Sequence, residues 1–316
     1  MTSTKVTTVY KSHAEWLAPR NKHIGASEVP TILGISPYDT PYKLWLRKTG
    51  QVTEPEGDNF LMRVGYYLED GVARLCADEM GLDIIRSSAA EFTVHDKDKP
   101  YFVVSPDRYC WQKGKKRTAA NKVILECKTT QNPVEDLPQY WFVQVMAQLG
   151  VCGIDQGVIT WLVRGGIDFG FRWIDFDATL FKEVIEAEVE RFWTDNILGG
   201  NEPALSDIGD VIHKYPASVA GKTMEATPAL LEKWGELRET NAEIKRLKAN
   251  KEAIEAYIKQ QMADNEAIVC DNKPLFTWKS GQASRKFNEA ALRENHGQLY
   301  EEYLIEKPGA RIFLTK

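Results

Sequence analysis

The chain has 316 residues, of which 43% are hydrophobic and 27% are charged, and its net charge is −5. This composition is ordinary for a soluble globular protein with room for one large or two modest domains. No apolar run approaches the roughly 18 residues of a membrane span, and the first residues lack the apolar core of a signal peptide, so a cytoplasmic protein is expected. The negative charge argues against a protein that coats nucleic acid. The five cysteines include no C-x-x-C pair, which disfavours a cysteine-ligated metal site.

The first 50 residues are predicted to contain short helices. Ser27 is an expected N-cap for a helix that starts with the sequence EVPTILG. Thr40 is the expected cap of the next helix, which begins at Pro41 and stops at Gly50.

A longer helix is predicted over residues 58–81. Its expected core face is an apolar stripe formed by Leu61, Val64, Leu68, Val72 and Leu75. Glu69 lies off this stripe, alongside the small residues Gly65, Ala73 and Cys76. Small side chains allow a helix to approach a sheet closely, so this face is expected to bring Glu69 near the sheet.

The middle of the chain predicts an α+β fold with a mixed sheet flanked by helices. Five short strand-like runs cover residues 82–86, 90–96, 100–105, 108–112 and 122–128. A helix over 138–153 opens at Pro138, and a further helix covers about 177–198. Between them, strands 156–164 and 168–176 are joined by Gly165-Gly166, a hairpin signal.

The last third of the chain reads as a separate extension. Residues 201–218 resemble a linker, and 228–263 predict one long polar helix with an apolar stripe. This stripe either packs against the preceding domain or forms an arm that contacts a partner or another subunit. A small α+β tail with a closing strand at 310–316 follows. The predicted domains are therefore 1–215 and a C-terminal extension, 216–316.

Three charged residues mark the ends of two neighbouring apolar strands. Asp107 follows the strand at 100–105, while Glu126 and Lys128 lie two apart on the strand at 122–128 and so share a face. Two carboxylates of this kind make a hard oxygen site suited to Mg²⁺ or Mn²⁺. A lysine on the same face can orient water and stabilise charge on a phosphate. The alternative is an ion pair on an edge strand, with Asp107 in an ordinary turn.

Five sequence blocks, in order over about 140 residues, resemble the YqaJ-like viral recombinases. This family includes phage lambda exonuclease and belongs to the PD-(D/E)XK nucleases, whose fold is restriction-endonuclease-like. The blocks are IGASEVPTILGISPYDTPYKLW (24–45), GYYLEDGVA (65–73), SPD (105–107), LECK (125–128) and YWFVQVMAQLGVCG (140–153).

The resemblance implies roles for individual residues. It implies that Asp107, Glu126 and the backbone carbonyl of Cys127 bind Mg²⁺, for which Mn²⁺ is expected to substitute, and that Lys128 is the catalytic lysine. Three further positions correspond to the family's helical acidic residue, its motif glutamine and an aromatic residue three positions before that glutamine: Glu69, Gln144 and Trp141. The chain departs from the family at Arg108, where glycine is usual, and in the long basic stretch 113–122.

The resemblance also implies an activity and partners. The expected function is metal-dependent digestion of one strand of linear duplex DNA from 5′ to 3′, which leaves a 3′ single-stranded tail. It implies a single-strand annealing protein as partner, a homo-oligomer such as a ring-shaped trimer, and a phage or prophage protein in the bacterial cytoplasm. An endonuclease of the same superfamily and a non-catalytic DNA-binding recombination protein remain as alternatives.

Two groups of residues are candidates for contact with DNA. Arg20 precedes Ser27 by seven residues, and this spacing resembles the pair that lines the family's 5′-phosphate pocket. An arginine fork suits a terminal phosphate. The basic stretch contributes Lys115, Lys116 and Arg117, which either touch the DNA backbone or form a solvated hairpin tip.

Overall fold

The computed structural model describes residues 5–17, 19–52, 60–85, 92–165, 168–306 and 309–314. The chain divides into two compact units, 1–214 and 215–316. The division falls one residue before the boundary expected from the sequence. Within the described ranges, every helix is too short or too polar to cross a membrane.

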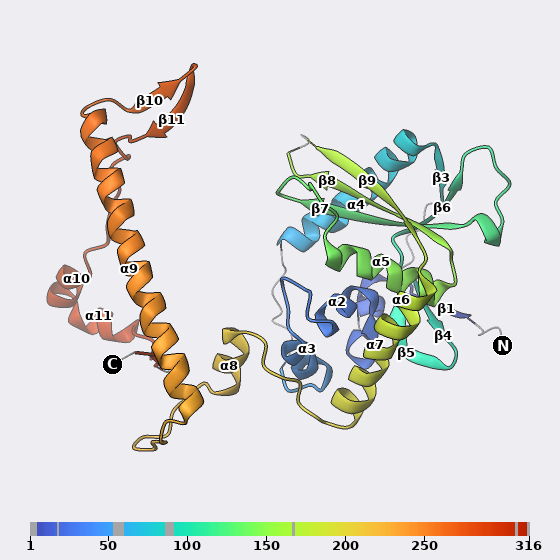
Figure 1. The fold of residues 1–316 in the computed structure, drawn as a ribbon, viewed down its shortest axis with the longest axis horizontal. Coiled ribbons are helices and arrows are strands. Elements are labelled where there is room, and N and C mark those ends of the chain that lie inside the picture. Colours follow the sequence, from blue (N-terminus) through green and yellow to red (C-terminus); the bar gives the residue numbers. More distant parts are fainter. Residues whose placement is uncertain are drawn as a thin grey trace. The chain divides into compact units, whose positions relative to one another are not determined.

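A five-stranded mixed sheet forms the centre of the first unit (Figure 1). Its strand order is β3-β6-β7-β8-β9, with β7 and β8 parallel and the other neighbours antiparallel. The strands are β3 (Leu82–Ile84), β6 (Arg108–Gln112), β7 (Val123–Thr130), β8 (Gln156–Val163) and β9 (Phe169–Asp175). With helices on both faces, this confirms the predicted α+β class. Gly165 follows β8, while Gly166, the second residue of the expected hairpin signal, lies outside the described residues.

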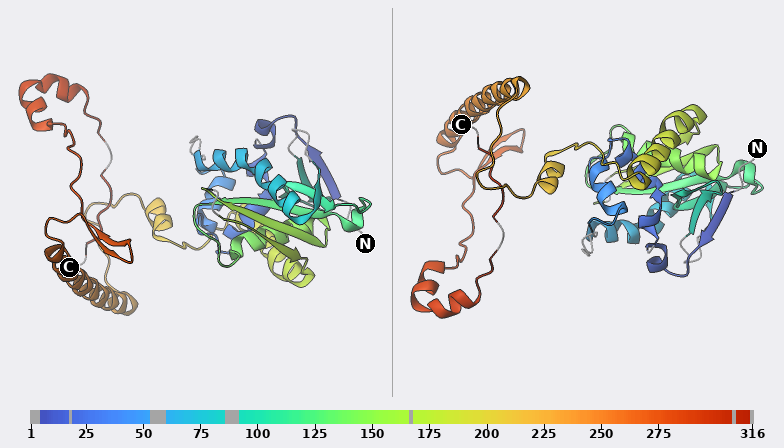
Figure 2. Two further views of the ribbon diagram at one scale, coloured as in Figure 1. Left: turned by 90° about the horizontal axis from the view of Figure 1, so that it is seen from above. Right: turned by 90° about the horizontal axis from the view of Figure 1, so that it is seen from below.

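Two helices cover opposite faces of this sheet (Figure 2). Helix α4 (Phe60–Met80) packs on the side to which Val123 and Leu125 of β7 point. Helix α5 (Gln139–Cys152) packs on the side of Ile124. Because side chains alternate along a strand, Glu126 and Lys128 follow Ile124 towards α5.

The core face of α4 differs from the expected stripe. Its buried residues are Val72, Ala73, Cys76 and Ala77, whereas Leu61, Leu68 and Leu75 are exposed. The prediction was right for Val72 and wrong for the three leucines, because this helix approaches the sheet closely with the face that carries its small side chains. The expected small-residue face is thus the one that meets the sheet, and Glu69 lies one turn before Ala73.

A second, four-stranded sheet has the order β1-β4-β5-β2. The middle strands, β4 (Phe92–Asp96) and β5 (Lys99–Val104), were predicted from the sequence. The outer strands, β1 (Lys5–Val9) and β2 (Ile24–Gly25), were not. β1 is mostly exposed and β2 has two residues, so neither shows a strand pattern.

Of the two predicted starts of the short N-terminal helices, the one at Thr40 is confirmed and the one at Ser27 is wrong. Thr40 caps α3 (Pro41–Lys48) as expected, since its side chain accepts a hydrogen bond from the Lys43 N–H at 3.2 Å. Ser27 is not an N-cap. It lies inside the 3-10 turn η2 (Ala26–Glu28), in which Glu28 accepts from the Gly25 N–H at 2.8 Å, and α2 (Val29–Ile32) follows. The remaining elements here are α1 (His13–Leu17) and η1 (Arg20–Lys22).

A continuous helical segment with two π-helical stretches closes the first unit. It contains α6 (Ala178–Leu180), η4 (Phe181–Glu186), α7 (Ala187–Arg191) and η5 (Phe192–Leu198). The expected linker, 201–218, contains a helix, α8 (Ile208–Lys214), which belongs to the first unit. The buried Asp210 of α8 accepts a hydrogen bond from the Thr40 hydroxyl at 2.7 Å, which attaches this segment to α3.

The second unit consists of one long helix and a sparse tail. It contains α9 (Pro228–Met262), the β10 (Ala267–Cys270) and β11 (Lys273–Thr277) hairpin, α10 (Glu289–Asn295) and α11 (Gly297–Glu302). Most of the apolar stripe on α9 is exposed, including Leu230, Trp234 and Ile254. The expected closing strand is absent from the described part of the tail, 309–314.

Candidate active site

Strand β7 loses one of its neighbours in the middle of its length. β6 pairs with it only as far as Arg108, which lies opposite Leu125, so Glu126 to Thr130 extend beyond β6. The Cys127 N–H on this open side donates to the Asp107 carboxylate at 2.7 Å. In a strand the N–H and C=O of one residue point the same way, so the Cys127 carbonyl is directed to this side too. Groups from both faces of the sheet can therefore reach the same point at this open edge of β7.

Glu126 is buried within a network of donors. It is only 3% exposed, and its Oε1 accepts from Lys128 Nζ at 2.7 Å and from Gln144 Nε2 at 2.6 Å. Its Oε2 accepts from Gln148 Nε2 at 2.8 Å. Lys128 Nζ also donates to Gln144 Oε1 at 2.8 Å. Burial by itself lowers the pKa of Lys128, but the charges of Glu126 and Asp107 outweigh it and hold that pKa above its usual value.

Asp107 lies among other carboxylates. Burial is the main cause that raises its pKa well above the usual range, and the charges of Glu126 and Glu69 raise it further. Lys128 and the Cys127 N–H act in the opposite direction. A carboxylate in this position is stabilised in its charged form by a nearby cation.

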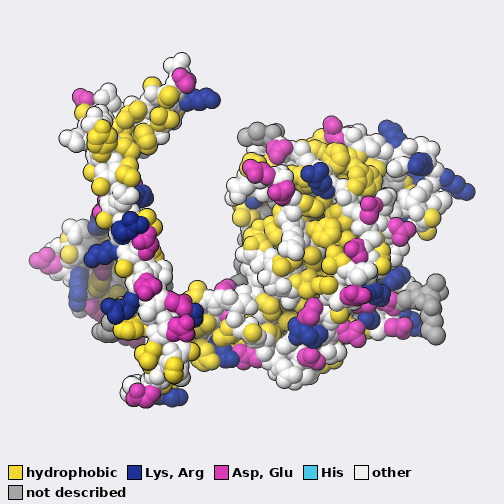
Figure 3. Space-filling view, in the orientation of Figure 1, with side chains coloured by type: hydrophobic (Ala, Val, Ile, Leu, Met, Phe, Trp, Pro, Cys, Tyr) yellow, Lys and Arg dark blue, Asp and Glu magenta, His cyan; other side chains and the backbone are white. Residues whose placement is uncertain are grey.

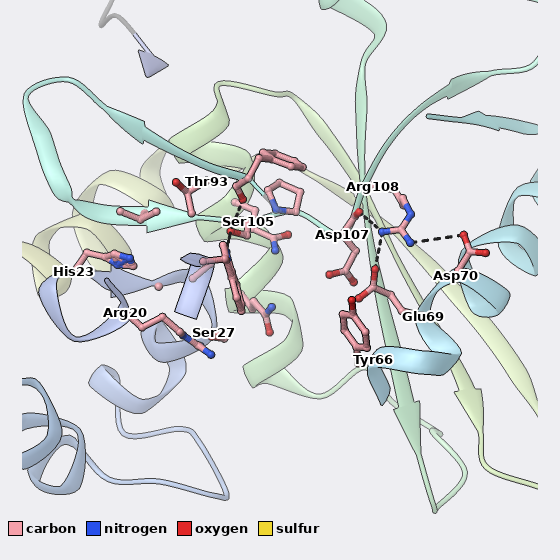
Figure 4. Close-up of a pocket in the computed structure, with 18 of the residues that line it drawn as sticks. Arg20, His23, Ser27, Tyr66, Glu69, Asp70, Thr93, Ser105, Asp107 and Arg108 are labelled. Carbon is pink, nitrogen blue, oxygen red and sulfur yellow. Dashed lines mark hydrogen bonds and ion pairs between the residues drawn. The ribbon is translucent and has the colours of Figure 1, made fainter. Parts of the chain in front are cut away.

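Glu69 reaches the site from α4 and is bonded to Arg108. Arg108 Nη1 donates to Glu69 Oε1 and to the Asp107 carbonyl, both at 2.6 Å. Figure 4 shows Arg108 between the acidic side chains of α4 and Asp107. The predicted approach of Glu69 to the strand residues is therefore what the structure shows.

A cavity of about 490 Å³ opens beside these groups. Its wall includes Asp107 and Glu69 on one side and Arg20 and Ser27 on the other (Figure 4). Gln144 also lines it. The Arg20 guanidinium stacks over the Trp16 ring, 5.1 Å from its centre. The cavity thus joins the acidic cluster to the two residues that the sequence suggested for a terminal phosphate.

Lys48 supports the Arg20 side of the cavity. Its buried ammonium donates to the carbonyls of Arg20 and His23, both at 2.6 Å, and pairs with Glu28 at 2.8 Å. Burial lowers the pKa of Lys48 although the charge of Glu28 raises it. Burial, followed by the positive charges of Lys48 and Arg20, lowers the pKa of the neighbouring His23 to about 4.

Two sets of predicted DNA-contacting residues lie away from the cavity wall. Trp141 is 7% exposed and packs at 6.4 Å from the Trp161 ring, so its expected contact with DNA has no exposed ring face to use. Lys115, Lys116 and Arg117 are exposed in the connection between β6 and β7, at the far end of β6 from Asp107. In Figure 3 dark blue side chains gather at the tip of this connection. Arg117 stacks over Trp111 and pairs with Asp83 at 3.7 Å.

Sequence reasoning missed Gln148 and underrated Arg108. Gln148 lies four residues after Gln144, so both amides project from one face of α5 towards Glu126. This i, i+4 spacing was the available signal. Arg108 was noted only as a departure from the family, and nothing in its local sequence predicts the contact with Glu69.

Two comparisons with known proteins bear on the family of this chain. The model of the YqaJ-like viral recombinase domain matches residues 15–155. The uncharacterized protein YqaJ of Bacillus subtilis (strain 168) is 31% identical over 301 residues, which cover 92% of this chain and 90% of that protein. The chain belongs to the YqaJ family. Membership therefore extends over both units, beyond the 15–155 match.

Solved structures with some likeness to this YqaJ-family chain include two exonucleases. An alkaline exonuclease from Laribacter hongkongensis is 18% identical, with a TM-score of 0.43, and the match covers 58% of this chain and 91% of that one. A phage-related exonuclease from Haemophilus somnus 129PT is 12% identical, with a TM-score of 0.39, and the match covers 57% and 96%.

The donor set of the acidic cluster fits a hard divalent cation. Asp107 and Glu126 offer carboxylate oxygens, and the Cys127 carbonyl points to the same open edge. Burial, followed by the charges of Glu126 and Glu69, raises the pKa of Asp107, and a bound cation would favour the charged form of this carboxylate. Among the described residues, no group of three His, Cys, Asp or Glu side chains is arranged to hold a metal ion by itself. An ion here would thus take further ligands from the backbone and from water or substrate, as Mg²⁺ usually does.

Proposed function

We propose that this protein is a metal-dependent deoxyribonuclease that digests one strand of linear duplex DNA from its 5′ end. The observation that carries the proposal is the bonded group of Glu126, Lys128 and Gln144 beside half-buried Asp107. Gln144 and Asp107 line a cavity whose wall also includes Arg20. Family membership supports a role in viral recombination. The product would be duplex DNA with a 3′ single-stranded tail.

The proposed chemistry is hydrolysis of a phosphodiester at the open edge of β7. Asp107, Glu126 and the Cys127 carbonyl would hold Mg²⁺, or Mn²⁺ in its place. When bound, the ion supplies Lewis acidity and lowers the pKa of a bound water. Lys128 would orient the attacking water and stabilise negative charge on the phosphate. Gln144 forms hydrogen bonds with both Lys128 and Glu126, so it would hold these two side chains in a fixed position relative to each other.

The far side of the cavity would receive the DNA end. Arg20 presents a fork of N–H donors, and a terminal phosphate carries more charge and more free oxygens than an internal diester. Its carbonyl is anchored by Lys48, which limits the movement of the turn that carries it. Ser27 would add a hydroxyl donor.

Partners are proposed from the family alone. The 3′ single-stranded tail would be the substrate of a single-strand annealing protein of the same recombination system. A homo-oligomer, such as a ring-shaped trimer around the DNA, would keep the enzyme on its substrate between cleavage steps.

The test compares four DNA substrates with purified protein and Mg²⁺. Digestion is followed over time for each substrate. The substrates are linear duplexes with 5′-phosphate ends, linear duplexes with 5′-hydroxyl ends, a covalently closed circle, and a duplex labelled at one 3′ end. We expect digestion of linear DNA only, faster from 5′-phosphate ends, with the 3′ label retained in long products. Cleavage of the circle would instead identify an endonuclease.

Arg20→Gln tests the proposed end recognition. It should reduce the preference for 5′-phosphate ends, while Lys22→Gln, an exposed neighbour in the same turn, should leave that preference unchanged. An Arg20→Gln variant that retains the full preference would show that the phosphate binds elsewhere.

A further inference from the structure

Arg108 is the least expected charge in the acidic cluster. It is the first residue of β6, and its side chain is only 12% exposed. Its guanidinium donates to Glu69 Oε1 and to the Asp107 carbonyl, both at 2.6 Å, and lies 3.7 Å from Asp70. One cation thus joins two acidic side chains of α4 to the strand end that carries Asp107.

This placement gives the third carboxylate of the cluster a cation from the protein itself. A guanidinium remains charged at all ordinary pH values. A bond of this length, with both partners charged, belongs to the strong class of hydrogen bonds. Glu126 also has a protein cation, Lys128, but it shares that ammonium with Gln144 and accepts from two glutamine amides. The Asp107 carboxylate, in contrast, accepts from the Cys127 N–H.

We propose that Arg108 acts as a fixed cation that keeps Glu69 out of metal coordination, so that this centre takes a single divalent ion. This inference rests on the proposed function and deepens it. In two-metal nuclease sites the ions lie about 3.5–4 Å apart and share carboxylates. A second ion next to Glu69 would have to displace the guanidinium or lie against its charge, and repulsion at such distances is strong in a partly buried site.

In this position Arg108 affects the reaction indirectly, and it is not a metal ligand. It is a positioning residue that acts through Glu69 and the turn at Asp107. A purely structural tie between α4 and β6 would affect folding but would leave the number of bound ions unchanged.

The experiment counts ions on the full-length protein without DNA. Mn²⁺ is titrated by calorimetry, and bound Mn²⁺ is followed by electron paramagnetic resonance, in which two neighbouring ions couple. The wild type should bind one ion. Arg108→Gln should bind two, while Arg74→Gln, which removes another ion pair to Asp70 on α4, should still bind one.

Acidic variants separate the ligands from the paired carboxylate. Glu126→Gln should weaken binding of the first ion by about tenfold or more. Glu69→Gln should leave the wild-type ion count and affinity unchanged, but it should abolish the second ion in the Arg108→Gln background.

Each result decides a different point. Two coupled ions in the wild type, or an unchanged count in folded Arg108→Gln, would overturn the single-ion inference and leave the nuclease proposal standing. No bound ion in the wild type would overturn the metal-dependent function itself. If Arg108→Gln does not fold, the wild-type count and Glu69→Gln still decide the inference, because loss of affinity in Glu69→Gln would identify Glu69 as a ligand.

Discussion

At the scale of single residues, the site depends on how the buried side chain of Glu126 is surrounded by hydrogen-bond donors. Its two oxygens accept from Lys128, Gln144 and Gln148. A buried carboxylate without such partners would be very costly, and removing one partner of a buried pair leaves a charge uncompensated. The network therefore supplies the hydrogen-bond partners that this buried carboxylate requires.

Lys128→Met and Glu126→Gln should separate catalysis from metal binding. Lys128→Met should retain Mn²⁺ binding, lose nuclease activity by about 100-fold or more and lower the free energy of unfolding. Glu126→Gln should weaken metal binding by about tenfold or more and lose activity. Calorimetry, a single-turnover nuclease assay and urea unfolding are the measurements.

Lys182→Met provides the matched control for Lys128→Met. It removes an exposed lysine that pairs with Glu186 at 2.8 Å, and it should change neither activity nor stability appreciably. Near wild-type turnover by Lys128→Met would remove this lysine from the mechanism.

His23 should make the stability of the protein depend on pH. Its pKa is lowered from about 6.5 to about 4, mainly by burial and then by Lys48 and Arg20. Between these values the unfolded chain binds more protons than the folded one, so the stability present above pH 6.5 is lost as the pH falls towards 4. The loss attributable to His23 should reach roughly 3 kcal/mol.

Urea unfolding at pH 7.5 and pH 5 measures this effect in the wild type and in two variants. His23→Gln, which cannot titrate, should flatten the dependence, while His296→Gln at an exposed position should not. Equal pH dependence in all three proteins would contradict the assignment.

At the scale of elements, the site lies beside the first residue of β6, Arg108, where β7 extends beyond its pairing with β6. α5 brings two glutamines to one face of β7, and the small residues of α4 let that helix bring Glu69 to the other. The basic connection between β6 and β7 lies at the opposite end of these strands. Five strand residues span about 17 Å, so this connection could contact only DNA that extends beyond the cavity.

Neutralising the basic connection should weaken binding of duplex DNA without affecting the chemical step. In the variant with Lys115→Gln, Lys116→Gln and Arg117→Gln, the slope of log affinity against log salt should become shallower by up to about 0.9 per lost phosphate contact. Fluorescence anisotropy over a series of salt concentrations measures this slope. A variant with Lys233, Lys245 and Lys248 of α9 changed to Gln carries the same charge loss as a control. An unchanged slope in the first variant would mean that the connection is only a solvated tip.

At the scale of the whole molecule, the two units differ in how much they bury. Both hydrophobic clusters of the described chain belong to residues 1–214. In the second unit, Met262 is the one buried hydrophobic residue among those that the structure describes. A chain of this size needs a substantial apolar core to offset its conformational entropy.

The first unit should therefore fold alone, and the second should not. Residues 1–214 should show a cooperative thermal transition by circular dichroism, while residues 215–316 should melt gradually with partial helix content. A cooperative transition for the isolated second unit would show that it contains, or gains by self-association, a core of its own. Sedimentation of the same sample distinguishes these two cases.

Local patterns in the sequence determined the parts of this protein that depend on neighbours along the chain. The period of two places Glu126 and Lys128 on one face, Thr40 and Pro41 start a helix, and alternating strands and helices indicate the α+β class. Only the tertiary structure decided which distant groups meet. It paired Arg108 with Glu69, brought Gln148 to Glu126 and buried Trp141, because these contacts depend on where β6 ends and how closely α4 and α5 approach the sheet. Periodicity specifies the direction of a side chain, whereas its partner is set by the packing of elements that lie far apart in the sequence.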